Sequence, residues 1–474
     1  MNAGWRLLGG MGLLEMSAVA PAETRVSSLI PQHIDNWTVT AVFAVCVIVA
    51  LIVARLAAVQ NRSAAGAYEA DGGMVERKNG LAMTGDYLSA VSLLGIPAII
   101  MTCGEDGLIY AVGFLAGWPL MTFLMAERLK NLGKFTFADV VAYRFHQVPI
   151  RVFAASSTLT VTVLYLAAQM VGVGQLIRLL FGLEYWMAVT IAGAMMMLYA
   201  RLVGMSATTW IAIVKAVLLL AGAFVMVFMT LLKLDFNFGL LLAGLAEKES
   251  FALSPEVWRA DPVSTLSLGM TLMFGVIGLP HVLMRFFTAP GAKDARCSAF
   301  RATVWNGCFY MLSIIIGLGA LCFVLDVPVF LEAGGNLKGG ENMAAIHLAY
   351  AVGGEAFMGF MAAVAFVTIL AVAARLVLAG AATVSHDLYA SVFRKGRPEP
   401  GSELRVAHAT ALCLGALAVL LGMACEDLNI AVMVSLVFAI AASSCFPVLF
   451  LSIFWKNCTT RGAVIGGFVG LGSA

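Results

Sequence analysis

The chain has 474 residues, of which 61% are hydrophobic and only 12% are charged, and its mean hydropathy is +0.94. Charged residues make up about a quarter of an ordinary globular chain, so this composition excludes a soluble enzyme, a fibrous protein and a disordered chain. The formal net charge of +2 excludes the basic surface that nucleic-acid binding requires. The nine cysteines form no CxxC pair and no cluster with histidine, so we expect no cofactor and no transition-metal site.

Apolar stretches long enough to cross a bilayer recur along the whole chain. A transmembrane helix needs about 20 mostly apolar residues, because unpaired backbone groups are not tolerated in lipid. The first such stretch is 37–58, which follows an N-terminal segment 1–36. Ten more follow, at 80–101, 108–126, 150–178, 186–203, 207–233, 262–285, 300–325, 356–385, 404–424 and 428–454. A last apolar run, 460–474, has only 15 residues, so we expect a shortened helix there.

The distribution of Lys and Arg orients these spans. Loops expected on one side of the membrane carry 20 of the 29 basic residues, loops on the other side carry 7, and 2 lie inside spans. Because cytoplasmic loops are enriched in Lys and Arg, the N-terminus is predicted to lie outside. The segment 1–36 also has features of a signal peptide, with Arg6, an apolar run and an Ala-x-Ala site, although Glu15 interrupts that run. Cleavage at this site stays open.

Two of the expected spans contain helix-breaking residues at matching places. These residues are Gly85, Gly95 and Pro97 in 80–101, and Gly269, Gly275, Gly278 and Pro280 in 262–285. Each span opens a block of five, 80–233 and 262–454, and five is odd, so the second block starts from the opposite side. This pattern predicts inverted repeats, whose interrupted helices surround a site near the membrane midplane. Gly and Pro are also frequent in ordinary transmembrane helices, but their matched position favours a transporter.

Ionisable residues inside spans are costly and therefore point to function. Asp86 lies beside Gly85, where its carboxylate could hold a cation near the helix break or could cap a helix close to the interface. For Lys215, we favour a side chain that extends to the inner membrane surface. Arg375 lies ten residues before the expected helix end at Ser385, which is about 15 Å deep at 1.5 Å per residue.

Many long motifs occur in an order that closely resembles one family of transporters. They begin with Gly85-Asp86-Tyr87-Leu88-Ser89-Ala90, Asp106-Gly107-Leu108-Ile109-Tyr110, Ala126-Glu127-Arg128-Leu129-Lys130-Asn131-Leu132-Gly133 and Thr136-Phe137-Ala138-Asp139. They continue with Ala207-Thr208-Thr209-Trp210, Gly278-Leu279-Pro280-His281, Met284-Arg285-Phe286-Phe287-Thr288, Asn342-Met343-Ala344-Ala345-Ile346-His347, Val384-Ser385-His386-Asp387-Leu388-Tyr389 and Thr459-Thr460-Arg461-Gly462-Ala463. In these motifs residues 76–470 resemble the solute:sodium symporter family, and within it the bacterial cation/acetate symporters, or acetate permeases.

The resemblance implies an all-α polytopic membrane protein with the leucine-transporter type of fold. Two inverted five-helix repeats, 80–233 and 262–454, follow one extra N-terminal helix, and the C-terminal helices are incomplete compared with the family. It implies a secondary active symporter of the bacterial inner membrane that imports a short-chain monocarboxylate, acetate first, together with Na⁺. A membrane sensor or scaffold that keeps the transporter fold without transport is the alternative.

The resemblance also implies positions for the two ligands. The cation site lies between the broken second span and the ninth, and its matching residues are Gly85, Asp86, Leu88, Ser89, Thr368, Ala371 and Val372. For the substrate we choose polar or aromatic residues near the breaks, which are Ser92, Tyr165, Gln169, Thr271 and Phe274.

The sequence departs from the family pattern at the cation site. Many members have a pair of hydroxyl residues where this chain has Ala371-Val372, and sodium prefers hard oxygen ligands. The loss puts sodium in question and leaves H⁺ as the alternative coupling ion. Arg375 stands where close relatives have a small residue, and it shares a helical face with Thr368. Its guanidinium could replace a bound cation, or it could turn away and extend to the inner surface.

Overall fold

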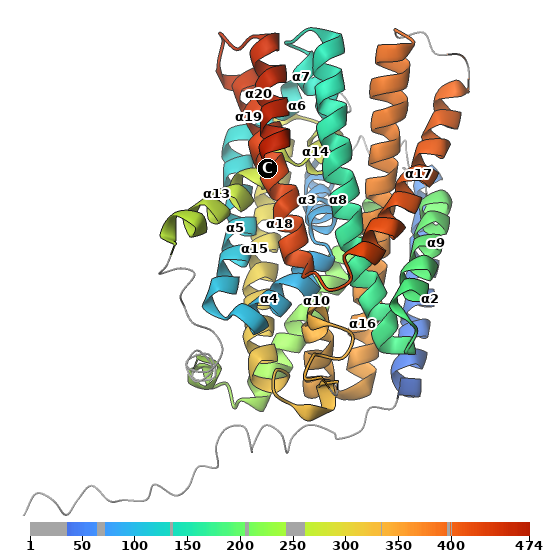
Figure 1. Cartoon of the computed structure of the whole chain (residues 1–474), viewed down its shortest axis with the longest axis vertical. Coiled ribbons are helices and arrows are strands. Elements are labelled where there is room, and N and C mark those ends of the chain that lie inside the picture. Colours follow the sequence, from blue (N-terminus) through green and yellow to red (C-terminus); the bar gives the residue numbers. More distant parts are fainter. Residues whose placement is uncertain are drawn as a thin grey trace, which may run out of the picture.

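Long helices account for nearly all of the residues that the computed structural model describes, which are 36–63, 72–132, 136–203, 208–242, 261–332, 334–395, 399 and 401–474. Figure 1 shows these helices as an elongated bundle. Within the described residues the only extended pairing is an isolated bridge between Leu331 and Leu337. The predicted signal peptide lies outside the described residues.

The helices of the first half of the chain follow one another with short connections. After α2 (Asn36–Ser63) they are α3 (Gly72–Tyr87), η1 (Val91–Gly95), α4 (Ile96–Cys103), α5 (Glu105–Leu120), η2 (Met121–Met125), α6 (Ala126–Leu132), α7 (Phe137–Ala142), α8 (Gln147–Phe181), α9 (Tyr185–Val203) and α10 (Thr208–Lys233). Of these, η1 and η2 are single turns of π-helix, a conformation that is rare in helices and frequent at functional sites.

The second half contains a second series of long helices. They are α13 (Pro262–Gly278), α14 (Pro280–Leu283), η3 (Met284–Thr288), α15 (Ala292–Phe323), η4 (Pro328–Phe330), η5 (Glu341–Met343), α16 (Ala344–Ala382), η6 (Thr383–Phe393), α17 (Ser402–Ala424), α18 (Ile430–Ile440), η7 (Ala441–Cys445), α19 (Phe446–Phe454) and α20 (Thr460–Ser473). The longest, α16, is kinked at Gly354, whose φ of 72° takes it out of the helical region.

Both helix breaks predicted from Gly and Pro are confirmed. The chain bends by 66° between α3 and η1, and by 45° between α13 and α14. Pro280 contributes to the second break because a proline inside a helix removes a backbone hydrogen bond. Each bent pair has the combined length and hydropathy of one membrane span. The described residues contain seven further helices that are long and apolar enough to cross a membrane, and neither α2 nor α9 is among these seven.

Glycines bring each broken helix against the last span of its own half. A Cβ on Gly85 would overlap the backbone carbonyl of Ala212 in α10, and a Cβ on Gly278 would overlap that of Ala441 in η7. Only glycine fits such close backbone contacts. At Gly269, also in α13, a Cβ would meet nothing within 4 Å. The two halves therefore use the same type of helix contact, as expected of structural repeats.

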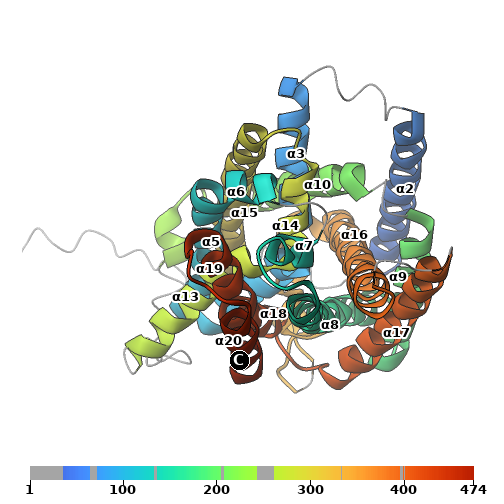
Figure 2. The same cartoon turned by 90° about the horizontal axis from the view of Figure 1, so that it is seen from above.

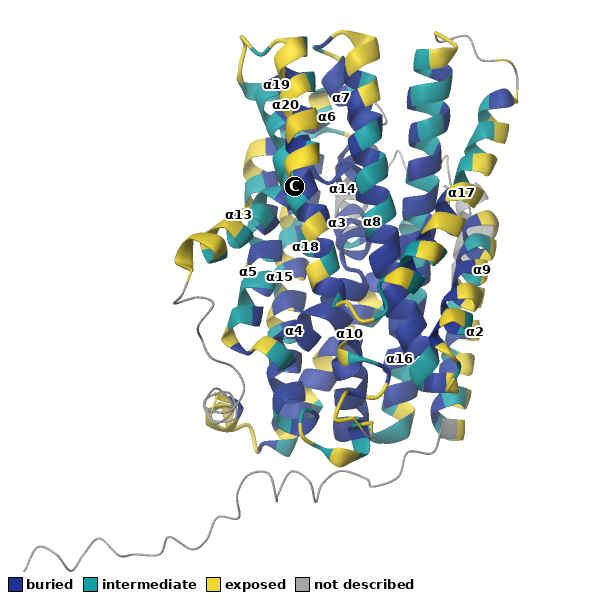
Figure 3. Cartoon of the chain, viewed as in Figure 1, coloured by how far each residue is buried: buried dark blue, intermediate teal, exposed yellow. Residues whose placement is uncertain are grey.

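The centre of the bundle is formed by α8 and α16. In the apolar 18-residue stretch of each span, 78% of the residues are buried for α8 and 83% for the span that contains α16, against 22% for α17. In the view from above, α8, α14 and α16 surround the middle of the bundle, and α2, α9 and α17 lie along one side (Figure 2). Figure 3 shows the same distinction, with buried residues concentrated on the central helices and exposed residues on the outer faces and helix ends. Charged side chains near the α3 break therefore lie deep in the protein.

Candidate functional site

Asp86 is the centre of a buried charge cluster at the first helix break. It lies in the last turn of α3, and its side chain is 5% exposed. One carboxylate oxygen, Oδ2, lies 2.5 Å from Nε of Arg285, and the other forms an ion pair with Arg375. Arg285 also donates a hydrogen bond of 2.8 Å to Thr209 Oγ1. Asp86 does not cap a helix, because α3 begins at Gly72; that interpretation of the sequence is wrong.

Lys215 of α10 is directed toward the same break. Its side chain is buried, with 4% of the residue exposed, and Nζ donates a hydrogen bond of 2.8 Å to the backbone carbonyl of Leu88. The expectation that Lys215 extends to the membrane surface is therefore wrong. The break leaves carbonyl groups without helical partners, and a buried ammonium provides one of them with a donor.

Ser89, the first residue after Leu88, connects the break to α8. Tyr165 donates a hydrogen bond of 3.0 Å to Ser89 Oγ, and the backbone N–H of Ser89 donates to Ser92 Oγ at 3.5 Å. The Ser92 hydroxyl also lies 3.5 Å from the hydroxyl of Tyr310 in α15. The structure thus brings together two of the residues chosen for the substrate, Ser92 and Tyr165, through one chosen for the cation.

The other three substrate candidates lie in different surroundings. Gln169 is fully buried one turn beyond Tyr165 on α8, and neither its amide nitrogen nor its oxygen has a hydrogen-bond partner among the described residues. Thr271 and Phe274 lie on α13, where the Phe274 ring stacks on Phe446 of α19 at a centroid distance of 4.7 Å. The ring contact of Phe274 is thus with α19.

The expected cation face of α16 borders a cavity. Ala371, Val372 and Arg375 line it together with Asp86 and Lys215. Further lining residues are Tyr199, Ile211, Ala212, His281, Ala374, Leu376 and Leu378. On the same α16 face, Thr368 is 1% exposed and its hydroxyl has no hydrogen-bond partner among the described residues. The cavity therefore joins the first break, α10 and α16, which are elements far apart in the sequence.

A second cavity links the break region to one end of the bundle. His281 lines both cavities, and its ring lies 5.5 Å from that of Tyr165. At its other end the second cavity is lined by Thr136 and Asp387. His281 follows the break between α13 and α14, so the two broken helices meet in the region that joins the cavities.

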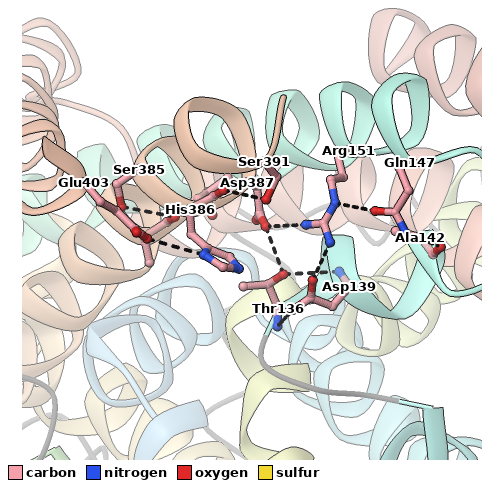
Figure 4. A network of polar contacts seen from close by, with 12 residues as sticks. Thr136, Asp139, Ala142, Gln147, Arg151, Ser385, His386, Asp387, Ser391 and Glu403 are labelled. Atoms are coloured by element: carbon pink, nitrogen blue, oxygen red, sulfur yellow. Dashed lines mark hydrogen bonds and ion pairs between the residues drawn. The ribbon is translucent and has the colours of Figure 1, made fainter. Parts of the chain in front are cut away.

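A polar network includes Thr136 and Asp387, which line the second cavity (Figure 4). Arg151 of α8 lies between two carboxylates, with N–O distances of 2.8 Å to Asp139 and 3.0 Å to Asp387. Asp139 also forms a capping box with Thr136 at the start of α7. Possible metal-ligand atoms of Asp139, His386 and Asp387 lie within 4.8 Å of one another. Because Arg151 already pairs with both carboxylates, this cluster is a salt-bridge network.

The sequence interpretation did not identify several charged residues of these sites. Arg285, Asp139 and Asp387 stand within motifs that carry the family resemblance. Arg285 is 199 residues from its partner Asp86, and Asp387 is 236 residues from its partner Arg151, which also pairs with Asp139 only 12 residues away. A charge inside a span needs a partner of opposite charge, and a search for the partner of Asp86 could have identified Arg285. Lys215 was identified as intramembrane, but its direction along the helix was predicted incorrectly.

A comparison with known families decides the class of the protein. Residues 68–470 match the model of the sodium:solute symporter family. The chain belongs to the sodium:solute symporter family. A member of this family is a multi-pass membrane transporter, in agreement with the apolar helices and the two broken spans.

The solved structures show the same fold. The chain is similar to a Na⁺-coupled sialic acid symporter in a substrate-bound outward-open state, with a TM-score of 0.72, 18% identity, and coverage of 92% of this chain and 91% of that chain. The fold is therefore the leucine-transporter type, with two inverted five-helix repeats after one extra N-terminal helix. Weaker matches include a manganese transporter of Eremococcus coleocola (TM-score 0.47, 14% identity, 83% of each chain) and a nucleobase-cation-symport-1 family transporter (TM-score 0.43, 12% identity, 84% and 91%).

Proposed function

We propose that this sodium:solute symporter family member imports a short-chain monocarboxylate, with acetate as the first candidate, coupled to a cation. The observation that supports an anionic substrate is the charge at the first helix break. Three basic side chains, those of Lys215, Arg285 and Arg375, surround the Asp86 carboxylate. Basic groups in a region with little water attract an anion, so a small carboxylate entering this region would be stabilised.

The substrate site extends from Ser89 to the polar face of α8. Tyr165 and Ser92 supply hydroxyl groups there, and the Gln169 amide supplies two donors and an acceptor without described partners. A buried amide is normally hydrogen-bonded, so its open positions favour a polar ligand. Thr271 and Phe274 would approach this site from α13.

The cation site lies between the break and the α16 face, and sodium is its first candidate. Backbone carbonyls near Gly85 and Leu88 and the hydroxyls of Ser89 and Thr368 are hard oxygen ligands of the kind that sodium prefers. The Thr368 hydroxyl, buried without a described partner, fits such a ligand. Ala371 and Val372 complete the face without side-chain oxygens, and H⁺ is the alternative coupling ion.

Arg375 would act as a substitute for part of the bound cation charge. Its guanidinium pairs with Asp86, which is the carboxylate proposed to stabilise the cation. Because a guanidinium keeps its charge at any physiological pH, Asp86 is neutralised permanently as long as this contact persists. Cation binding would then require the ion pair to separate or to be shared.

Coupling between the cation and the substrate follows because both would bind next to the first helix break. A cation bound at Leu88 and Ser89 lies next to residues that contact the substrate, so each ligand raises the affinity for the other by the same factor. Movement of one repeat against the other would then expose the site to either side. The protein would lie in the inner membrane of a bacterium, with its N-terminus outside.

Uptake of labelled acetate by cells that express the full-length chain tests this proposal. Unlabelled propionate, glycolate and pyruvate should compete, because they differ from acetate by a methylene, a hydroxyl or a carbonyl, whereas a neutral amide such as acetamide should not. The matched control is a Tyr165→Phe, Gln169→Leu double variant, which keeps the side-chain volumes. Absence of uptake under both a sodium and a proton gradient would favour a sensor or scaffold instead.

A further inference from the structure

We infer that Lys215 is a built-in competitor of the coupling cation at the first helix break. The inference rests on the proposed function, because it concerns the regulation of the same cation site. The backbone carbonyl of Leu88 is one of the oxygens expected to bind the cation, and in the structure it accepts a hydrogen bond from Lys215 Nζ at 2.8 Å. One oxygen thus has two potential partners, a tethered ammonium and a free ion.

The position of Lys215 is fixed by the packing of its helix. Gly85 of α3 and Ala212 of α10 are in direct backbone contact, and Lys215 follows Ala212 by three residues, which places it on the same face of α10. The long lysine side chain therefore starts close to α3 and reaches Leu88 just beyond its end. Burial of the residue to 4% exposure removes water as an alternative partner for the ammonium.

Two like charges cannot share this carbonyl. A sodium ion at ligand distance from the Leu88 oxygen would lie next to the ammonium in a region with little water to screen the repulsion. Arg375, His281 and Asp86 line the same cavity, and Arg375 adds a second fixed positive charge. Sodium must therefore displace Lys215 before it can bind, and Lys215 lowers the apparent affinity for sodium.

The exchange of Lys215 for sodium at the Leu88 carbonyl also has a structural consequence. Without sodium, Lys215 holds the break by bonding to Leu88 and so connects α10 to the first broken helix. With sodium, that connection opens and the lysine side chain moves into the cavity it borders. Ion binding would thereby change the contact between the first and last spans of the same repeat.

Thermal unfolding of the purified full-length protein tests the inference without transport. Melts are recorded over a series of NaCl concentrations, with choline chloride keeping the ionic strength constant and no carboxylate substrate present. Lys215→Met and Lys215→Gln remove the charge, and Lys215→Arg keeps it. The neutral variants should reach half-maximal stabilisation at a sodium concentration at least about tenfold lower than wild type, equivalent to about 1.4 kcal/mol. Lys215→Arg should stay close to wild type.

Lys233→Met is the matched control. Lys233 lies on the same helix, 18 residues further along, and donates a hydrogen bond of 2.6 Å to the backbone carbonyl of Ala351. Lys233 is thus also an ammonium that is hydrogen-bonded to a backbone carbonyl, and it lies about 27 Å from Lys215 along α10. Its loss should leave the sodium dependence unchanged.

A second measurement uses the wild-type protein and needs no stable variant. Sodium should increase the rate at which phenyl isothiocyanate, an amine reagent that releases no carboxylate, modifies Lys215, measured by peptide mass spectrometry against choline, because the displaced amine no longer bonds to Leu88. An equal or slower rate in sodium, or neutral variants with wild-type sodium dependence, would overturn the competition. Failure of acetate uptake would overturn the proposed substrate and leave these sodium measurements standing.

Discussion

Asp86 and Arg285 connect the two broken helices directly. The Asp86 carboxylate and the Arg285 guanidinium lie 2.5 Å apart although 199 residues separate them in the chain. Asp86 lies in the last turn of α3 just before the first break, and Arg285 follows α14 just after the second. The repeats therefore share a buried ion pair between their interrupted helices, and any movement of one repeat against the other acts on this pair.

Removal of the Asp86 charge should destabilise the protein. Asp86→Asn breaks the ion pairs of this carboxylate with Arg285 and Arg375, and breaking a buried pair costs about 3–5 kcal/mol. It should also change the cation concentration for half-maximal uptake several-fold, about 1–2 kcal/mol. Thermal unfolding and uptake measure the two effects. The exposed acid Glu105 at the start of α5 is the control, through Glu105→Gln. A variant that melts like wild type would show that the pair does not stabilise the fold.

Replacement of Arg375 should strengthen cation dependence. Arg375→Gly removes the guanidinium that neutralises Asp86, while Arg285 still pairs with the other carboxylate oxygen. We expect the sodium concentration for half-maximal uptake to fall by about tenfold, or about 1.4 kcal/mol. Arg375→Lys preserves the charge and should behave like wild type. If Arg375→Gly leaves both the cation dependence and the transport rate unchanged, Arg375 does not substitute for a cation.

Gly85 should not tolerate a methyl group. Gly85→Ala places a Cβ on the backbone carbonyl of Ala212, which cannot move away as a side chain would, and such overpacking costs about 1–3 kcal/mol or more. Gly269→Ala is the matched control on the other broken helix, because nothing lies within 4 Å of its Cβ. Expression level and thermal unfolding compare the two variants. Equal stability of both would contradict the close contact between α3 and α10.

The Tyr165 hydroxyl should contribute to substrate affinity. Tyr165→Phe removes a hydroxyl that the proposed substrate site supplies, and one hydrogen bond to the substrate is worth about 1 kcal/mol, or about fivefold in affinity. We expect a higher KM for acetate, together with a loss of stability of about 1 kcal/mol from the 3.0 Å hydrogen bond to Ser89. Tyr143 is an exposed tyrosine in the connection between α7 and α8, and Tyr143→Phe should not change KM. An unchanged KM in Tyr165→Phe would remove this hydroxyl from the substrate site.

The presence of a break in each of two spans could be predicted from the sequence because Gly and Pro weaken helices locally, although the first break falls at Leu88 and Ser89, close to Gly85 rather than on a Gly or Pro. Pro280 disrupts a helix wherever it stands in the interior, and glycines at matched places in two blocks reveal the repeat. The contacts of charged side chains could not be predicted in this way. Lys215 reaches Leu88 rather than the membrane surface because Ala212 packs on Gly85, and that packing is a tertiary contact.

The charge pairs illustrate the same limit. Burial cost alone requires that Arg375 and Asp86 find partners, but helical spacing fixes only the face of a helix and not the direction of a long side chain. Arg151 likewise joins Asp139 and Asp387 (Figure 4), two acids from separate motifs whose proximity depends on how α7 and η6 pack on α8.

Accumulation of labelled acetate in proteoliposomes tests the central claim most directly. The purified full-length protein is reconstituted, and uptake is followed with an inward sodium gradient, with an inward proton gradient, and with either gradient collapsed by an ionophore. We predict accumulation above the external concentration that requires a cation gradient and disappears when that gradient is collapsed. Acetate that never exceeds its external concentration under either gradient would contradict cation-coupled import by this protein.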